Sequence, residues 1–315
     1  MKLQAKLAGV LFAAATVFAG TASAEDWSPS GPLMFQIGFG AGGSTDAMGR
    51  VIAKTMEEQT GWNVVVENKP GAGGVAMFTG IAKGKPDGQV IGMGVSTPIL
   101  LQLVARPEKV PFEVESFDYL TSVALGQLAL VARSEAPFDD LESMVEYAKA
   151  NGPMAVAINA SPHKLILGAV AQKTGVEFQF VSTDGGAESM KLLLGGQVAA
   201  SFAGGSHGAY LDSGDMKMIA VGNSDRHSYA PDVMTVAEQG YDVYLDSYFY
   251  IATTKGTDPA ILDALSEALS NALATDAVKE IVQNAAKTKV LGLSGEETQS
   301  KMMDGLPTMA KLLGK

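Results

Sequence analysis

The ten residues from Ile37 to Asp46, IGFGAGGSTD, constrain the fold of this chain more than any other segment. The apolar run from Leu33 to Ile37 predicts a strand, and the spacing of apolar residues from Ala47 to Gln59 predicts a helix, so the four glycines fall in a strand-to-helix turn. Such a turn presents the N–H groups of the first helical turn and the positive end of the helix dipole. Both features suit a phosphate or a carboxylate, and glycine lets a ligand approach the backbone. The alternative is a tight turn with a good helix cap and no ligand.

A dinucleotide is a second candidate ligand for the same turn. Gly38, Gly40 and Gly43 spell G-x-G-x-x-G, and Glu67 closes the next predicted strand, Val64 to Val66. That layout is typical of a dinucleotide-binding unit. A motif this short has many false positives, so the rest of the sequence must decide between a small anion and a dinucleotide.

The first 24 residues have the pattern of an export signal. Lys2 and Lys6 give a positive start, Leu7 to Gly20 is apolar, and Ala22 to Ala24 is a small-residue cleavage site. The 14 apolar residues are too few for a membrane anchor, which needs about 20. We therefore expect cleavage after Ala24 and export of the mature chain, away from the main nicotinamide pool.

The composition of the chain argues against several classes of binding partner. The chain has 315 residues, no cysteine, and 23 basic against 34 acidic residues, a balance that becomes more acidic when the signal is removed. The absence of cysteine excludes disulfides and a lipid attachment of the lipoprotein type. An acidic surface argues against nucleic acid and anionic membranes as partners. A chain of this length is expected to form two domains.

Short apolar segments alternate with helical ones along the chain. This alternation predicts an α/β protein in which helices cover mainly parallel sheets. The further predicted strands are Val64 to Val66, Val90 to Met93, Leu128 to Ala132, Ala155 to Ile158, Phe178 to Val181, Val198 to Phe202, Met218 to Val221 and Tyr248 to Ala252.

Glycine pairs recur at the predicted strand-to-helix turns. In an open α/β sheet, ligands bind beyond the carboxyl ends of the strands, so these turns are expected to line one cleft. The pairs that follow a predicted strand are Gly42-Gly43, Gly73-Gly74, Gly185-Gly186 and Gly204-Gly205.

Longer motifs give the chain a family resemblance. In order along nearly the whole chain, they resemble the receptors of tripartite tricarboxylate transporters, also called Bug-type periplasmic solute-binding proteins. The motifs are F-x-x-G-G-S-T-D from Phe39, V-E-N-K-P-G-A-G-G from Val66, P-D-G from Pro86, L-L-G-G-Q-V from Leu193 and P-D-V-M-T-V-A-E-Q-G from Pro231.

The resemblance implies a two-lobed periplasmic binding fold, type II-like, that closes on a small organic carboxylate, either a di- or tricarboxylate or an aromatic acid. We expect lobe 1 to comprise residues 25–126 and 249–315, and lobe 2 to comprise residues 127–248. The expected partners are the carboxylate and the large and small subunits of a membrane permease. The resemblance further implies a monomer with no cofactor, no metal and no enzymatic activity.

The resemblance also implies a site built from turns of both lobes. Relatives hold the carboxylate largely through main-chain groups and hydroxyls. The matched positions are Phe39, Ala41, Gly42, Gly43, Ser44, Thr45 and Asp46 in lobe 1, and Ser161, His163, Gly185, Gly186 and Ala187 in lobe 2.

The chain departs from the family pattern at three places. Gly38 stands where relatives commonly have proline, and Asp184 puts an acid next to the second glycine turn. Gly204 to His207 replaces a more usual acidic or amide element. We expect Ser206 and His207 to reach the distal end of the ligand.

Parts of the sequence also fit two other functions. Gly204 to Gly208 is a literal G-x-S-x-G, as in the nucleophile elbow of serine hydrolases, but the last histidine is His227, only 21 residues after Ser206. The three histidines show no i, i+4 pair, so a metal site is not expected. A binding module that serves sensing instead of uptake stays open.

Overall fold

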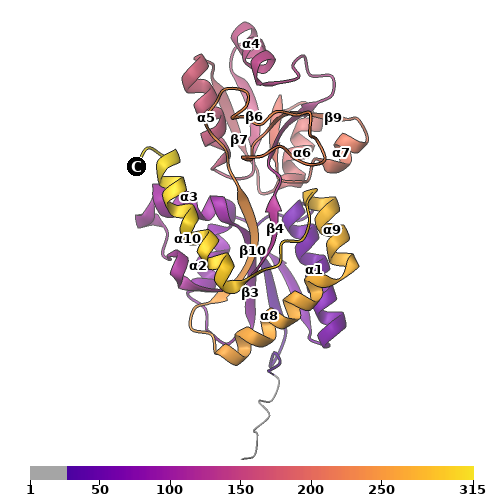
Figure 1. The fold of residues 1–315 in the computed structure, drawn as a ribbon, viewed down its shortest axis with the longest axis vertical. Helices are drawn as coiled ribbons and strands as arrows, with labels where there is room; N and C mark the ends of the chain where they lie inside the picture. Colours follow the sequence, from indigo (N-terminus) through magenta and orange to yellow (C-terminus); the bar gives the residue numbers. More distant parts are fainter. Residues whose placement is uncertain (1–26) are drawn as a thin grey trace, which may run out of the picture.

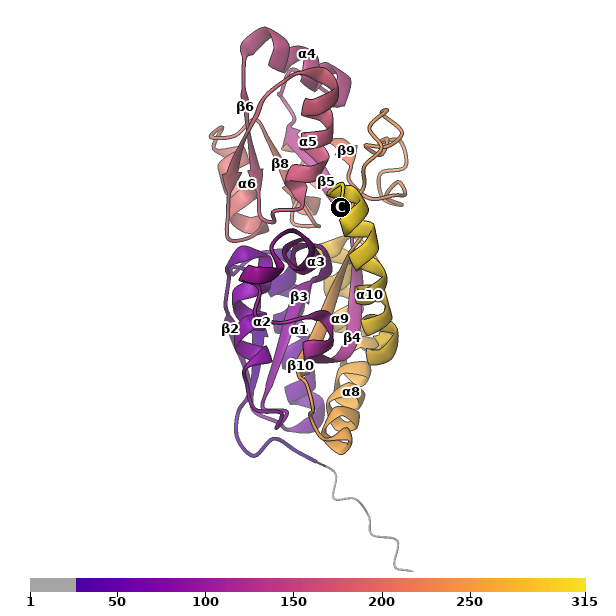
Figure 2. The same ribbon diagram turned by 90° about the vertical axis from the view of Figure 1, so that its left-hand side faces the viewer.

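A computed structural model describes residues 27–315 of the chain. The predicted signal peptide, residues 1–24, and its cleavage site lie outside the described residues. Two sheets, one above the other, form two lobes (Figures 1 and 2). The two-lobed α/β fold predicted from the sequence is confirmed.

Lobe 1 contains a six-stranded sheet with the order β11-β4-β10-β3-β1-β2. Helices α1, α8 and α9 cover one face, and α2, α3 and α10 cover the other. The strands are β1 (Leu33–Ile37), β2 (Val64–Asn68), β3 (Val90–Val95), β4 (Phe117–Gly126), β10 (Ser247–Thr254) and β11 (Leu293–Ser294). The helices are α1 (Ser44–Thr60), α2 (Val75–Ala82), α3 (Ser96–Ala105), α8 (Pro259–Ala274), α9 (Asp276–Ala286) and α10 (Gly295–Leu312), with 3₁₀ turns at Ala72–Gly74, Pro107–Lys109 and Val114–Ser116.

Lobe 2 contains a five-stranded sheet with the order β7-β6-β8-β5-β9. Helices α4 and α5 pack on one face, and α6 and α7 pack on the other. The strands are β5 (Ala129–Arg133), β6 (Met154–Ile158), β7 (Phe178–Ser182), β8 (Ala200–Ala203) and β9 (Met216–Val221). The helices are α4 (Leu141–Asn151), α5 (His163–Thr174), α6 (Gly186–Leu194) and α7 (Gly208–Asp212).

Both sheets are mixed, whereas the sequence predicts mainly parallel sheets. The parallel pairs are β1 with β2 and β3, and β6 with β7 and β8. β10 runs antiparallel to β3 and β4, and β5 runs antiparallel to β8 and β9. The difference arises at the strands that connect the lobes, because a chain that enters a lobe along one strand and returns along its neighbour reverses direction.

The chain passes between the lobes along two adjacent segments. β4 ends at Gly126 in lobe 1, and β5 begins three residues later, at Ala129, in lobe 2. The return passage leads into β10, whose first residue, Ser247, pairs with Gly126. The two passages therefore lie side by side at the boundary of the lobes, as Figure 1 shows for β4 and β10.

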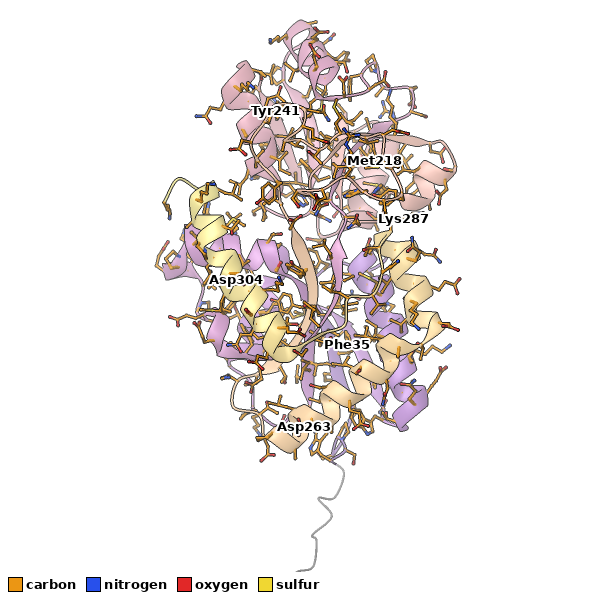
Figure 3. All side chains as sticks on the ribbon, viewed as in Figure 1. Phe35, Met218, Tyr241, Asp263, Lys287 and Asp304 are labelled. Atoms are coloured by element: carbon orange, nitrogen blue, oxygen red, sulfur yellow. The ribbon has the colours of Figure 1, made fainter. Side chains whose placement is uncertain are left out.

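Alternating side chains of the central strand β10 pack into two separate hydrophobic cores. Phe249 and Ile251 pack towards α1, α8 and α9, with Phe35 of β1 in the same cluster (Figure 3). Tyr250 and Ala252 pack towards α2, α3 and α10. This period of two is the one expected for a strand that is buried on both faces. Within residues 27–315, no helix has the length and apolar character to cross a membrane.

Candidate functional site

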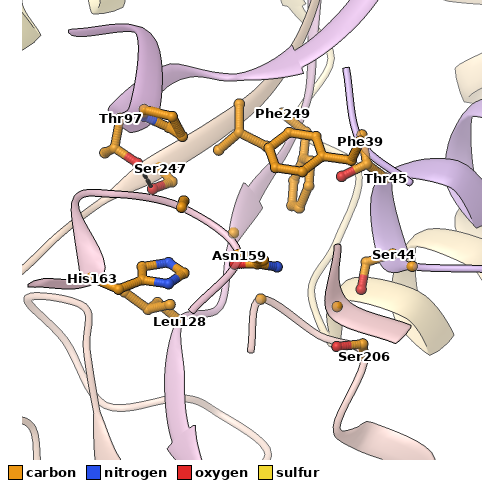
Figure 4. A pocket seen from close by; sticks show the side chains of 17 residues that line it. Phe39, Ser44, Thr45, Thr97, Leu128, Asn159, His163, Ser206, Ser247 and Phe249 are labelled. Atoms are coloured by element: carbon orange, nitrogen blue, oxygen red, sulfur yellow. Dashed lines mark hydrogen bonds between the residues drawn. The ribbon is translucent and has the colours of Figure 1, made fainter. Parts of the chain in front are cut away.

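A cavity lies between the lobes, where the turn from β1 to α1 meets the turn from β7 to α6 (Figure 4). It leaves about 60 Å³ for the centres of water-sized molecules, several times the room that one water needs, so it suits a small organic ligand. The lining residues are Phe39, Gly43, Ser44, Thr45, Val95, Thr97, Pro98, Gly126, Leu128, Asn159, Ala160, His163, Gly186, Gly204, Ser206, Ser247 and Phe249.

The wall of this cavity carries no charge. None of the 17 lining residues is an aspartate, glutamate, lysine or arginine. His163 is the titratable residue among them, and burial lowers its pKa to about 3, so its ring is neutral at neutral pH. Any electrostatic attraction within the wall must therefore come from backbone and side-chain dipoles.

Four helices begin at this wall, two from each lobe. Ser44 and Thr45 open α1, Thr97 lies in the first turn of α3, His163 opens α5 and Gly186 opens α6. Each helix N-terminus carries the equivalent of roughly half a positive charge. Four such ends around an uncharged cavity create a positive potential without a cationic side chain.

The same four helices lack side-chain caps. Among residues 27–315, no side chain bonds to the first N–H groups of α1, α3, α5 or α6. In contrast, α4, α8, α9 and α10 begin away from the cavity and are capped by Asp140, Asp258, Thr275 and Ser294. The short helices α2 and α7 have no such cap either. The cavity is thus bordered by helix ends that no side chain of their own satisfies.

The turn between β1 and α1 owes its shape to Gly42 and Asp46. Gly42 has a φ of +82°, a conformation that favours glycine, and its N–H donates to Asp46 Oδ2 at 2.9 Å. Asp46 Oδ1 accepts hydrogen bonds from Arg50 Nε at 2.9 Å and Asn68 Nδ2 at 2.8 Å. Burial opposes ionisation of Asp46, but these bonds outweigh it and lower the pKa of its carboxyl group. Asp46 therefore braces the turn and is already fully engaged.

Two buried polar atoms at the cavity have no partner within the described residues: Ser206 Oγ and His163 Nδ1. Ser206 lies against the start of α6, since a Cβ added at Gly186 would come within 2.5 Å of Ser206 Oγ. The ring of His163 packs on Phe202, with 4.9 Å between centroids. Because buried polar groups are normally hydrogen-bonded, both atoms are candidate ligand contacts. Within residues 27–315, no histidine hydrogen-bonds to Ser206 Oγ.

The structure brings half of the predicted site residues to the cavity wall. Those that line it are Phe39, Gly43, Ser44, Thr45, His163, Gly186 and Ser206. The others lie beside the same turns without lining the cavity: Ala41, Gly42, Asp46, Ser161, Gly185, Ala187 and His207.

His207 is directed into lobe 2 instead. Its Nε2 lies 2.8 Å from Tyr229 Oη, which lies 2.9 Å from His227 Nδ1. His227 Nε2 lies 2.8 Å from Asn223 Oδ1, and the Asn223 amide donates to the carbonyl oxygens of Gly126 at 2.9 Å and Leu245 at 3.2 Å. Burial lowers the pKa of His207 to about 3 and that of His227 to about 4. This buried chain connects α7 with both passages between the lobes.

In the described part of the chain, the lobes are in contact through backbone atoms and through an ion pair. Gly40 N–H donates to the carbonyl oxygen of Asp184 at 2.9 Å, and the Asp184 side chain does not line the cavity. Lys287, at the boundary of the lobes in Figure 3, pairs with Asp212 at 2.9 Å. Gly205, with a φ of +119°, lies so close to the end of α9 that a Cβ there would overlap the Ala285 carbonyl. The structure is therefore a closed form.

Ten lining residues were not among the ligand contacts predicted residue by residue, although one of them, Gly204, belongs to a glycine pair that was expected to line the cleft. Some followed signals that the sequence does carry: Thr97 and Pro98 belong to a Ser-Thr-Pro helix start, and Ser247 and Phe249 lie where the chain was expected to cross between lobes. Others, such as Asn159, carry no such signal. The ten are Val95, Thr97, Pro98, Gly126, Leu128, Asn159, Ala160, Gly204, Ser247 and Phe249.

A metal centre finds no support in residues 27–315. No group of three histidine, cysteine, aspartate or glutamate side chains in this part of the chain could hold an ion. Its histidines face apolar neighbours or the hydrogen-bonded chain of lobe 2.

Comparisons with known proteins agree on one family. The family model described as "Tripartite tricarboxylate transporter family receptor" matches residues 48–303. Protein BugT from Bordetella pertussis is 32% identical over 309 residues, which cover 95% of this chain and 93% of that protein. The structure of the periplasmic binding protein BugD superposes with a TM-score of 0.81 at 27% identity, covering 91% of this chain and 98% of the other.

A more distant structural neighbour shares the fold. MatC from Rhodopseudomonas palustris, solved with bound malate, has a TM-score of 0.80 at 21% identity over 90% of this chain and 99% of its own. The family match spans most of the chain and both lobes, and the resemblance seen in the sequence is confirmed. This chain belongs to the tripartite tricarboxylate transporter receptor family of periplasmic solute-binding proteins.

Proposed function

We propose that this protein captures a small organic carboxylate in the periplasm by closure of its lobes and delivers it to the large and small subunits of a membrane permease. The observation that carries the proposal is the set of four helix N-termini, free of side-chain caps, around an uncharged cavity. Such helix ends are anion-binding sites in their own right. The ligand favours the closed form because only there do both lobes donate to it.

The polar groups of the cavity support a ligand with two anionic ends. In Figure 4, Ser44, Thr45 and Ser206 lie on one side, whereas Thr97 and Ser247 lie on the other. The rings of Phe39 and Phe249 lie between them. A dicarboxylate with a short apolar middle matches this order. The fold neighbour with bound malate is consistent with a ligand of this class.

A thermal-shift panel tests the anion. Succinate is compared with its neutral diamide, succinamide, which keeps the length and most hydrogen-bonding atoms, and with butyrate, which has one carboxylate. A ligand at 100 times its dissociation constant adds about 2.7 kcal/mol to the free energy of unfolding, which shifts the melting temperature measurably. We expect stabilisation by dicarboxylates and none by the diamide. Equal shifts with acid and amide, or shifts only with sugars and amines, would contradict the proposal.

Two further measurements test export and uptake. The mass of the protein recovered from the periplasm is expected to correspond to a chain that begins at Glu25. Deletion of the gene is expected to abolish uptake of the acid identified by the panel, and the chain restored without residues 1–24 is not expected to rescue uptake.

A further inference from the structure

A second groove lies directly behind the ligand cavity. It has a volume of about 220 Å³ and is formed by α3, α10 and the segment before β10. Thr97 is part of the wall of both spaces. The groove is lined by Thr97, Leu100, Tyr244, Leu245, Asp246, Tyr248, Lys301, Asp304, Gly305, Thr308, Met309 and Leu312.

The first residues of β10 form part of the partition. Ser247 and Phe249 line the ligand cavity, whereas Asp246 and Tyr248 line the groove. This is the alternation of a strand, whose successive side chains point to opposite faces. The two spaces are therefore separated by one thickness of backbone and by the side chains that bridge from β10 to α3.

A direct side-chain contact closes the gap between β10 and α3. Thr97 Oγ1 and Ser247 Oγ lie 2.6 Å apart, as drawn in Figure 4, and Thr97 is 7% exposed. A second bond, from Tyr248 N–H to Ser96 Oγ at 2.9 Å, holds the two elements in register. When the Thr97–Ser247 contact is removed, the hydrogen bond from Tyr248 to Ser96 thus still connects β10 and α3.

We propose that the Thr97–Ser247 pair is the end wall that limits ligand length. The inference rests on the proposed function: an acid anchored at Ser44 and Ser206 extends towards this wall, and the two hydroxyls meet its distal end. A longer acid would have to pass into the groove behind, where Leu100, Tyr248 and Met309 offer apolar surface. Lys301 offers a cation there, in a lining that also holds the carboxylates of Asp246 and Asp304. Ser247 begins β10 of the lobe 1 sheet, two residues before the lobe boundary expected from the sequence. Both wall residues therefore belong to lobe 1, so the limit does not depend on how far the lobes close.

The test combines variants of the two wall residues with dicarboxylates of increasing length. A double variant, Thr97→Ala with Ser247→Gly, removes the contact, and Thr97→Ser keeps a hydroxyl in place. Affinities are measured by calorimetry for the straight-chain series succinate, adipate and suberate. The wild type and Thr97→Ser are expected to lose affinity beyond a certain length. The double variant is expected to gain about tenfold for the next longer acid, since two more methylenes become buried. The same length profile in all three proteins would overturn the proposal.

A second pair of variants tests whether the longer acid enters the groove. In the double-variant background, Lys301→Gln is expected to weaken the longest dicarboxylate while sparing succinate. Lys311→Gln is the matched control, because Lys311 lies on the same helix and does not line the groove. An equal effect of both lysine changes would contradict passage into the groove.

A crystal structure of the double variant separates this inference from the proposed function. One continuous cavity from Ser44 to Lys301 is expected whether or not the ligand is a carboxylate. If the two spaces remain separate, the wall lies elsewhere and the inference fails. If they merge but no acid of any length binds the wild type, the proposed function fails instead.

Discussion

The N–H of Gly40 donates a hydrogen bond of 2.9 Å to the carbonyl oxygen of Asp184, and this bond joins the first turn of lobe 1 to the turn before α6 in lobe 2. Because this backbone contact joins turns of two different lobes, it requires the lobes to be closed. Next to it, Gly43 at the start of α1 lies against the N–H of Gly186 at the start of α6.

Gly40→Pro removes the donor of this bond, whereas Gly40→Ala keeps it, because an added Cβ would come no closer than 3.4 Å to Asp184. One hydrogen bond contributes about 1 kcal/mol, so the proline variant is expected to bind its ligand about fivefold more weakly than the alanine variant. Small-angle scattering with ligand present is expected to show a larger radius of gyration for the proline variant. Identical affinity and scattering would show that this contact does not stabilise closure.

Ser206→Ala is expected to weaken carboxylate binding at least about tenfold, because a hydrogen bond to a charged group is worth about 1.5 to 3 kcal/mol. The matched control is Ser213→Ala, which changes an exposed hydroxyl of the same lobe. Calorimetry should show wild-type affinity for the control and unchanged melting temperatures for both empty proteins. A wild-type affinity in Ser206→Ala would remove Ser206 from the site.

Asn223→Ala is expected to lower the free energy of unfolding by about 3 kcal/mol or more. The side chain satisfies the Leu128 N–H at 2.6 Å and the Gly126 carbonyl at 2.9 Å, and each buried group left without a partner costs about 1 to 3 kcal/mol. Urea denaturation measures the loss. Asn151→Ala, whose amide bonds only the Tyr147 carbonyl on an exposed helix end, should cost far less. Equal losses would contradict a special role for Asn223.

The stability of the fold is expected to fall on acidification below about pH 6.5. Burial lowers the pKa values of His163, His207 and His227 from 6.5 to about 3, 3 and 4. Below the ordinary pKa the unfolded chain therefore binds protons that the folded chain resists. Each histidine then costs about 1.4 kcal/mol per pH unit until its folded pKa is reached.

Urea denaturation at several pH values between about 6.5 and 4 measures this slope. His227→Gln removes one of the three groups and should reduce the slope by about a third. If the slope is unchanged in this variant, His227 is not held neutral by burial.

The sequence predicted those site residues whose position depends on local structure. Gly43, Ser44 and Thr45 reach the cavity because a glycine turn before a helix directs that helix end beyond the edge of the sheet. Asp46 is one residue further along, and the sequence does not reveal that Arg50 and Asn68 engage its carboxylate. Side-chain direction at that position is decided by tertiary partners.

Other residues could not be assigned without the strand order. Thr97 faces the cavity because β3 lies beside β1, and Asn159 does so because β6 lies between β7 and β8. His207 follows Ser206 directly, yet it points into lobe 2, where Tyr229 and His227 come from a distant loop. The two-lobed fold followed from alternation and family motifs, but the antiparallel strands at the passages follow only from how the chain returns to lobe 1.

The uneven distribution of helix caps implies a trade-off between the thermal stability of the fold and its affinity for an anionic ligand. A helix start without a cap sacrifices about 1 kcal/mol relative to one with serine or aspartate, and this protein does so at four places that face one cavity. Directed evolution for heat resistance would therefore favour new caps at these positions. At α1, α3 and α6 each new cap would occupy N–H donors that an anion needs, whereas the first N–H groups of α5 already bond to backbone carbonyls. Selection for thermal tolerance alone should therefore weaken the binding of dilute acids.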